Sequence, residues 1–120
     1  LGAGGQERSE AHARASGRLA TVMNPRFLST LTLTVVPGTP LARAQAEGRF
    51  LLPDIRGLLR ELRWFLEEAQ PRAAIFRSDH ASNHLPIQGR LPRDRASLLA
   101  AIDAALAGRK SLRPEWVRGL

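Results

Sequence analysis

The segment SDHASNH, residues 78–84, carries the side chains best suited to binding or catalysis. His80 and His84 stand four residues apart, with Asp79 and Asn83 beside them. Two histidines at this spacing share one face of a helix and can then bind a metal ion together. The neighbouring Ser, Asn and Pro residues favour a loop, however, and no third ligand stands at a recognisable spacing. We therefore predict a loop held by local hydrogen bonds rather than a metal site.

Two glycine-containing segments could also meet a ligand. "GAGG", residues 2–5, precedes a predicted helix, and "PGTP", residues 37–40, follows a predicted strand. The carboxyl ends of parallel strands meet at one edge of a sheet, so both segments should lie near the loop of residues 78–84. A tight turn explains residues 2–5 at least as well, and residues 37–40 are more typical of a turn than of a ligand site.

The elements that must position these segments alternate between helix and strand. Ala11, Ala15, Leu19 and Val22 recur at helical spacing and predict a helix over residues 6–22 with those side chains in the core. The further predictions are a strand at 27–36, a short helix at 40–47, a helix at 53–69, a strand at 73–78, a loop at 79–90 and a helix from Pro92 to Gly108. In the tail, Trp116 and Val117 are available to pack back on the domain.

The strand at residues 27–36 alternates between apolar and hydroxyl side chains. The apolar set should pack under helices, and the hydroxyl set should face a polar interior. The first set is Phe27, Leu31, Leu33 and Val35, and the second is Thr30, Thr32 and Thr34. Strands that alternate with helices predict parallel βαβ units.

Composition limits the class of protein. The 120 residues carry a formal net charge of +7, and the basic residues are nearly all arginines that alternate with acidic residues along the predicted helices. This pattern favours a solvated surface, although a basic α/β module that binds RNA or another acidic partner remains an alternative. The chain contains no cysteine and therefore no thiolate ligand for a metal or cluster. No apolar run is long enough to span a membrane, and with no export signal we expect a cytoplasmic protein.

Four segments taken together resemble one protein family. They are "LGAGGQERSEAH", "MNPRFLSTLTLTVVPGTPLARAQAEGRF", "IFRSDHASNHLPIQGRLPRDRASLLAAID" and "LRPEWVRGL". Their order is similar to the C-terminal part of bacterial radical S-adenosylmethionine (radical SAM) proteins, in the group related to Elongator-type and methylthiotransferase-type enzymes. Asp79 stands where the family pattern has Asn, and His84 where it has an aromatic residue.

The resemblance implies an α/β fold, namely the C-terminal portion of a partial (βα)₆ TIM-like barrel that is rich in helix and has a short parallel sheet. The chain would be a single unit. Residues 1–52 would hold the end of strand 5, helix 5, strand 6 and a loop. Residues 53–120 would hold the closing helix, a strand and a C-terminal helical extension. The parent protein would be longer than this chain.

The same resemblance implies the cofactors of the parent protein and the residues near them. Radical SAM enzymes cleave S-adenosylmethionine reductively with a [4Fe–4S] cluster held by a Cys-x-x-x-Cys-x-x-Cys loop, which this chain lacks. The chain alone would be inactive. Asp79, His80 and Asn83 would form a substrate-side loop, next to an unknown substrate that could be RNA. The residues implied near the adenosine are Gly2, Gly4, Gly5, Val35, Val36 and Pro37.

Overall fold

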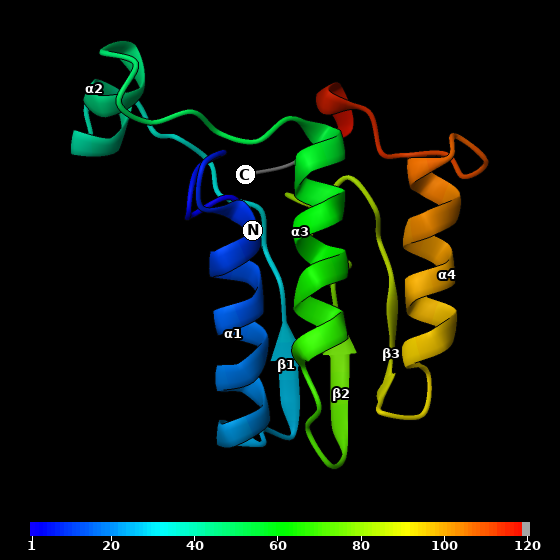
Figure 1. Cartoon of the computed structure of the whole chain (residues 1–120). Coiled ribbons are helices and arrows are strands. Elements are labelled where there is room, and N and C mark those ends of the chain that lie inside the picture. The colour runs from blue at the N-terminus through cyan, green and yellow to red at the C-terminus, as the bar shows by residue number, and fades with distance from the viewer. Residues whose placement is uncertain (119–120) are drawn as a thin grey trace.

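The computed structural model describes residues 1–118, in which a mixed sheet of three strands has the order β1-β2-β3. The strands are β1 (Phe27–Ser29), β2 (Ala74–Arg77) and β3 (Gln88–Leu91). β1 runs parallel to β2, with Phe27 opposite Ile75. β3 runs antiparallel to β2, with Gly89 opposite Phe76. Figure 1 shows the arrows of β1 and β2 pointing the same way, toward the end of the molecule where the N-terminus lies.

Three of the four α-helices in residues 1–118 stand side by side against one face of the sheet (Figure 1). They are α1 (Ser9–Met23), α3 (Ile55–Glu68) and α4 (Arg95–Leu106). The short α2 (Pro40–Ala46) and a 3₁₀ turn, η1 (Glu115–Val117), lie beyond the carboxyl ends of β1 and β2. No described helix combines the length and apolar character that would let it cross a bilayer.

The core lies between this helical layer and the sheet. It includes Leu62, Leu66 and Ile102 from the helices and Phe76 from β2, all at most 2% exposed. The rings of Phe65 and Phe76 meet at 6.4 Å between their centroids. Burial of such side chains is the main source of stability for a domain of this size.

Side chains that cap the helices explain where two of them begin. The Asp54 carboxylate accepts a hydrogen bond of 2.7 Å from the backbone N–H of Gly57 and so starts α3. Thr39 accepts one of 3.2 Å from Ala42 at the start of α2, where Pro40 supplies a fixed φ. Caps of this kind satisfy backbone donors that the first turn leaves without a partner. The "PGTP" segment is thus a helix start as well as a turn.

The sheet differs from the predicted one. The segment expected as a loop at residues 79–90 contains β3 in its second half, and this strand is antiparallel, so the sheet is mixed rather than parallel. Gln88, Gly89 and Arg90 gave no strand signal, because polar residues and glycine are rare in strands. The hydrogen bonds to β2 override that local preference. Residues 1–118 form a small α/β domain and no closed barrel.

The predicted core face of α1 is wrong. Its buried residues are Ser9, Ala13, Gly17 and Ala20. Leu19 and Val22 are 57% and 83% exposed, respectively. The core face consists of small residues because α1 packs very closely on α3. A Cβ added to Gly17 would lie 2.6 Å from the carbonyl oxygen of Phe65.

The predicted faces of the strand at 27–36 are also reversed, and regular strand structure ends at Ser29. Thr30 and Thr32 are buried beneath the helices at 8% and 6% exposure, whereas Phe27 and Leu31 are exposed. Hydrogen bonds with the loop of residues 78–84 satisfy the Thr32 hydroxyl and the Thr30 carbonyl oxygen, as described below. The Thr30 hydroxyl is buried without a partner. The tail prediction fails for both residues, since Trp116 and Val117 are 86% and 49% exposed, respectively.

Candidate functional site at the carboxyl ends of the strands

Asn83 is the centre of a buried polar network where β1 and β2 end. Its side-chain amide donates hydrogen bonds to the Thr30 carbonyl oxygen at 2.7 Å and to Ser78 Oγ at 3.1 Å. Its Oδ1 accepts a hydrogen bond of 2.9 Å from the Thr32 hydroxyl. Asn83 is 2% exposed and Ser78 is fully buried. The loop is therefore tied to the extended segment after β1 by bonds that are costly to break.

His80 is held in one tautomer by Ser82. The backbone N–H of Ser82 donates to His80 Nδ1 at 3.1 Å, and Ser82 Oγ lies 2.9 Å from the same nitrogen. Because Thr32 donates its own backbone N–H to Ser82 Oγ at 3.1 Å, the hydroxyl proton is free to point to Nδ1. In the neutral ring, Nδ1 then accepts and Nε2 carries the proton. His80 is exposed, so Nε2 can donate to a ligand.

Two arginines near the C-terminus bind the backbone of this loop. Arg113 donates from Nη1 to the carbonyl oxygens of His80 and Asn83 at 2.8 and 3.1 Å. Arg118 donates from Nε to the Ser82 carbonyl oxygen at 2.9 Å. Sequence reasoning missed both residues, since an arginine that binds a backbone carbonyl 30 or more positions away leaves no spacing signal. Their contacts fix the loop that carries His80.

His84 is buried beside these arginines and does not lie in a common ligand set with His80. Its Nδ1 lies 3.3 Å from the Arg113 carbonyl oxygen, and its Nε2 lies 3.8 Å from the Glu115 carboxylate. Burial is the main cause that lowers the pKa of His84, and the positive charge of Arg118 acts in the same direction. His84 is therefore a buried packing residue. No three His, Asp or Glu side chains in residues 1–118 are grouped to hold a metal ion.

Asp79, in contrast, stands apart from the network. Its carboxylate is exposed and lies 3.8 Å from the guanidinium of Arg77, on the surface. Of the three residues assigned to the substrate-side loop, the structure thus joins His80 and Asn83 through Ser82 and Thr32 and leaves Asp79 free to turn toward solvent. An exposed pair of this kind contributes little to stability.

The glycines of residues 2–5 are packed against protein rather than open to a cleft. Gly2 has φ +87, and a Cβ placed there would lie 2.9 Å from Leu52 Cδ1. Gly4 is close to His12, and Gly5 to the ring of Phe50. Gly4 and Gly5 border a cavity of only about 80 Å³. This is smaller than the roughly 300 Å³ typical of small-molecule sites.

Glu61 of α3 anchors this segment and was missed by sequence reasoning, because its position lies on the apolar face of the helix. It is fully buried. Its carboxylate accepts hydrogen bonds of 2.7 Å from the Gly2 N–H and 2.6 Å from the Ser9 hydroxyl. His12 Nε2 is 3.9 Å away. Burial lowers the pKa of the Leu1 amino group, and the negative charge of Glu61 acts in the opposite direction.

A second hollow lies against the segment of residues 33–35. It measures about 300 Å³. Its lining residues are Leu33, Thr34, Val35, Gln45, Leu52, Glu115 and Arg118. Of the three residues assigned to the adenine, only Val35 is in this lining, while Val36 and Pro37 are exposed. The Val36 carbonyl oxygen accepts a bond of 2.7 Å from the Thr39 hydroxyl and closes the turn. Three of its lining residues are apolar and four are polar or charged.

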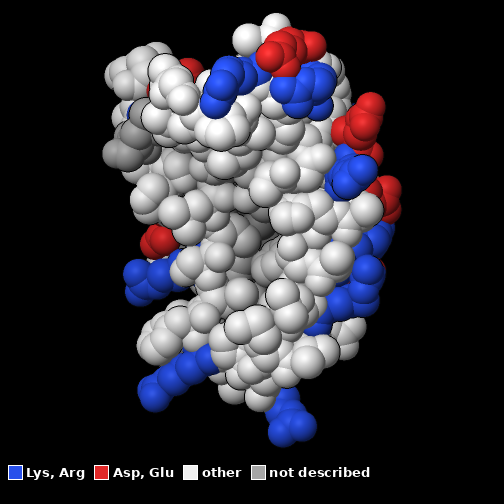
Figure 2. All heavy atoms as spheres, turned by 90° about the vertical axis from the view of Figure 1, so that its left-hand side faces the viewer, with Lys and Arg blue, Asp and Glu red and all other residues white. Residues whose placement is uncertain are grey.

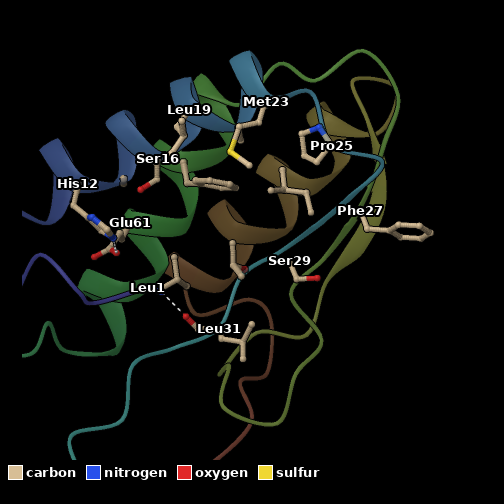
Figure 3. Close-up of a pocket in the computed structure, with 15 residues that line it drawn as sticks. Leu1, His12, Ser16, Leu19, Met23, Pro25, Phe27, Ser29, Leu31 and Glu61 are labelled. Atoms are coloured by element: carbon tan, nitrogen blue, oxygen red, sulfur yellow. Dashed lines mark hydrogen bonds and ion pairs between the residues drawn. The ribbon is translucent and has the colours of Figure 1, made fainter.

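A larger groove opens between α1 and β1 (Figure 3). Its volume is about 370 Å³, and its walls are mostly apolar, with Leu19 and Met23 from α1 and Leu28 from β1. His12 and Glu61 lie at one end, and Phe27 points away from α1. Figure 2 shows this side of the molecule as largely uncharged, with a hollow in the middle and charged side chains around it. No sequence pattern indicated this groove.

Comparisons of the chain with protein-family models, with curated proteins and with solved structures found no match.

Proposed function

We propose that this chain is the C-terminal part of a radical SAM enzyme and that it is inactive alone. In this proposal the hollow beside Val35 receives the adenosine side of S-adenosylmethionine, and the loop that carries His80 and Asn83 lies on the substrate side. The observation that carries the proposal is that segments 1–5, 30–36 and 78–84 lie together at the carboxyl ends of β1 and β2. Thr32 bonds to Asn83 at 2.9 Å, and the backbone N–H of Leu33 bonds to the Leu1 carbonyl oxygen at 2.8 Å.

The residues present fit an adenosyl group at one place. Leu33, Val35 and Leu52 form an apolar wall in the hollow of about 300 Å³, and Gln45 and Thr34 supply hydrogen-bonding groups. The packed glycines of residues 2–5 would act indirectly, since Gly2 lets Leu52 approach closely and so shapes that wall. When bound, S-adenosylmethionine supplies a radical upon reductive cleavage. The cluster that reduces it requires cysteines, and this chain has none, so its ligands belong to the remainder of the parent protein.

The direct test is to titrate S-adenosylmethionine into the 120-residue chain and follow backbone amide shifts by NMR. We expect shifts confined to residues 33–35 and 45–52. Val35→Asp should abolish them, because a carboxylate in the apolar wall would lose solvation when the ligand covers it. Val22→Asp is the matched control, since Val22 is an exposed valine outside that hollow and its substitution should leave the shifts unchanged.

A second test examines the native polypeptide in its source cells. We expect an intact mass well above 13.2 kDa and an upstream Cys-x-x-x-Cys-x-x-Cys sequence. A longer chain without that sequence would exclude the radical SAM assignment. Absence of any S-adenosylmethionine effect on residues 33–52, in the folded chain and in the parent, would remove the adenosine role from this hollow.

RNA binding is the second candidate, favoured by the face of the sheet that faces away from the helices. Phe27 and Arg77 are exposed there, and the Arg26 guanidinium lies 5.7 Å from the centre of the Phe27 ring. Aromatic rings with neighbouring arginines are typical of single-stranded nucleic-acid sites. Binding of an oligoribonucleotide that weakens steeply with salt and is lost in Phe27→Ala would support this candidate.

A further inference from the structure

The extended segment that follows β1 already makes two backbone bonds of the kind found between neighbouring parallel strands. The amino group of Leu1 donates to the Leu31 carbonyl oxygen, and the Leu33 N–H donates to the Leu1 carbonyl oxygen at 2.8 Å. In a parallel ladder, a residue bonds in this way to the two residues that flank its partner. Leu1 therefore lies opposite Thr32, in the direction of β1 and in a defined register.

The backbone groups further along this edge face outward. The Thr30 N–H donates to the Arg77 carbonyl oxygen at 3.0 Å, and the Ile75 N–H donates to the Arg26 carbonyl oxygen at 2.8 Å. Even-numbered residues of this segment thus bond to β2. Because backbone groups alternate along a strand, those of Phe27 and Ser29 and the N–H of Leu31 point to the opposite edge. That edge is a template for another strand.

The groove between α1 and β1 lies beside this edge and needs an apolar filling. Leu19 and Met23 are 57% and 67% exposed, and both line it together with Leu1 and Leu28. Its volume is about 370 Å³. The dashed line in Figure 3 marks the Leu1–Leu31 bond at the point where the groove meets the edge.

We propose that the polypeptide preceding Leu1 in the parent protein forms a strand parallel to β1 and fills this groove. The inference rests on the proposed function in one respect, that the parent is longer than this chain. Continuing the Leu1 register, the second residue before Leu1 donates its N–H to the Ser29 carbonyl oxygen and accepts from the Leu31 N–H. The fourth residue before Leu1 bonds in the same way to Phe27 and Ser29.

The register also determines which side chains enter the groove. The second and fourth residues before Leu1 lie opposite Thr30 and Leu28, which both line the groove. Directly opposed residues point to the same face of a sheet, so these two side chains must be apolar. The first and third residues before Leu1 lie on the same face as Phe27 and Ser29, away from the helices. A shift of one residue would exchange the two sets.

Hydrogen exchange tests the strand residue by residue. The probe is the 120-residue chain preceded by the five residues that precede it in the native polypeptide. We expect the amides of Ser29 and Leu31 to exchange at least tenfold more slowly than in the unextended chain. The amide of Thr30 is an internal control, since it is already bonded to β2. In the matched control variant, neighbouring residues of the added segment swap positions, so that the apolar side chains point away from the groove. This variant should give no protection of the Ser29 and Leu31 amides.

Each outcome decides the inference separately from the proposed function. Unchanged exchange at Ser29 and Leu31, equal protection by the control variant, or a native polypeptide with nothing before Leu1 would overturn the strand. Protection at Ser29 and Leu31 without any upstream three-cysteine sequence would keep the strand and exclude the radical SAM assignment.

Discussion

The two sides of α1 use apolar residues in opposite ways. Toward α3, small residues allow contact so close that a methyl group on Gly17 would meet the Phe65 carbonyl oxygen and Glu68 Cβ within 2.7 Å. Toward β1, the large side chains of Leu19 and Met23 border an open groove. The first side is a completed interface and the second is a surface that lacks its partner. Residue size along a helix therefore indicates how closely a neighbour approaches, as well as which side is buried.

The largest expected effect on stability is at Glu61 of α3, which binds Gly2 and the first residue of α1, Ser9. Glu61→Ala leaves the Gly2 N–H and the Ser9 hydroxyl without their acceptor in a buried place, and should lower the free energy of unfolding by about 3 kcal/mol. Urea unfolding followed by circular dichroism measures this. Glu10→Ala, which removes only the exposed ion pair with Arg14, should change it by less than about 0.5 kcal/mol. If Glu61→Ala and Glu10→Ala change the free energy of unfolding equally, Glu61 is solvated.

Gly17→Ala should lower the free energy of unfolding by about 2 kcal/mol, because overpacking a tight contact costs more than the helix gains from alanine. The substitution would separate α1 from α3. Ala15→Gly, on the exposed side of the same helix, should cost about 1 kcal/mol through helix propensity alone. A stabilising effect of Gly17→Ala would show that α1 can move away from α3 without loss.

The sequence predicted the helices well and the sides of α1 and β1 poorly, for one physical reason. Helix starts depend on local chemistry, such as Asp54 at α3 and Pro40 at α2, and this is visible in the sequence. Which face is buried depends on the neighbour, and the usual rule assigns the larger apolar residues to the core. At α1 the larger residues lie outside the core instead, Leu19 at the groove and Val22 in solvent. The rule therefore selected Leu19 and Val22 over Ala13 and Gly17.

The residues of the candidate site also fall into two groups, those that the sequence indicated and those that it did not. Asn83 and His80 were found from the sequence because Ser, Asn and His gather in one short loop. Thr32 was found as a polar strand residue, but its partner, Asn83, lies 51 positions away and no local rule connects them. Arg113, Arg118 and Glu61 were missed because their partners are backbone groups or distant hydroxyls. Local composition identifies a polar loop, whereas the bonds that shape it are tertiary.

Thr21→Val tests the hydrogen bonds at the completed side of α1. Thr21 Oγ1 accepts from the Gln70 N–H at 2.8 Å and lies 3.0 Å from the Glu68 carbonyl oxygen. Valine keeps the shape and removes the acceptor, so we expect a loss of about 1 kcal/mol in the free energy of unfolding. Thr21→Ser should retain most of that stability. If both variants lose the same amount, the methyl group rather than the hydroxyl is what matters.

His84, which is buried beside Arg113, makes the stability of the domain depend on pH. Burial lowers the pKa of His84, so the folded state prefers its neutral ring, and stability is complete above the ordinary value of 6.5. As pH falls below 6.5, the unfolded chain takes up the proton first and stability decreases. The charges of Glu115 and Arg118 lie near the surface, where solvent screens them, so we expect a loss below about 1 kcal/mol between pH 7.5 and 5.5. Urea unfolding at both pH values measures it.

His84→Phe removes the titrating ring and should reduce the difference between the two pH values. An unchanged difference in His84→Phe would mean that another group is responsible for it.

The smallest expected effect is Leu19→Ser in the 120-residue chain. A side chain that is 57% exposed loses little on truncation, so the free energy of unfolding should change by less than about 0.5 kcal/mol. In the chain extended by its five upstream residues, the same substitution should cost about 1–2 kcal/mol, because the added strand would then cover Leu19. Val22→Ser is the matched control, because Val22 is 83% exposed and lies outside the groove, so the extension should not alter its effect. The difference between the Leu19→Ser effects in the two chains measures how much the added strand stabilises Leu19. If the effect is the same in both chains, the strand does not reach α1.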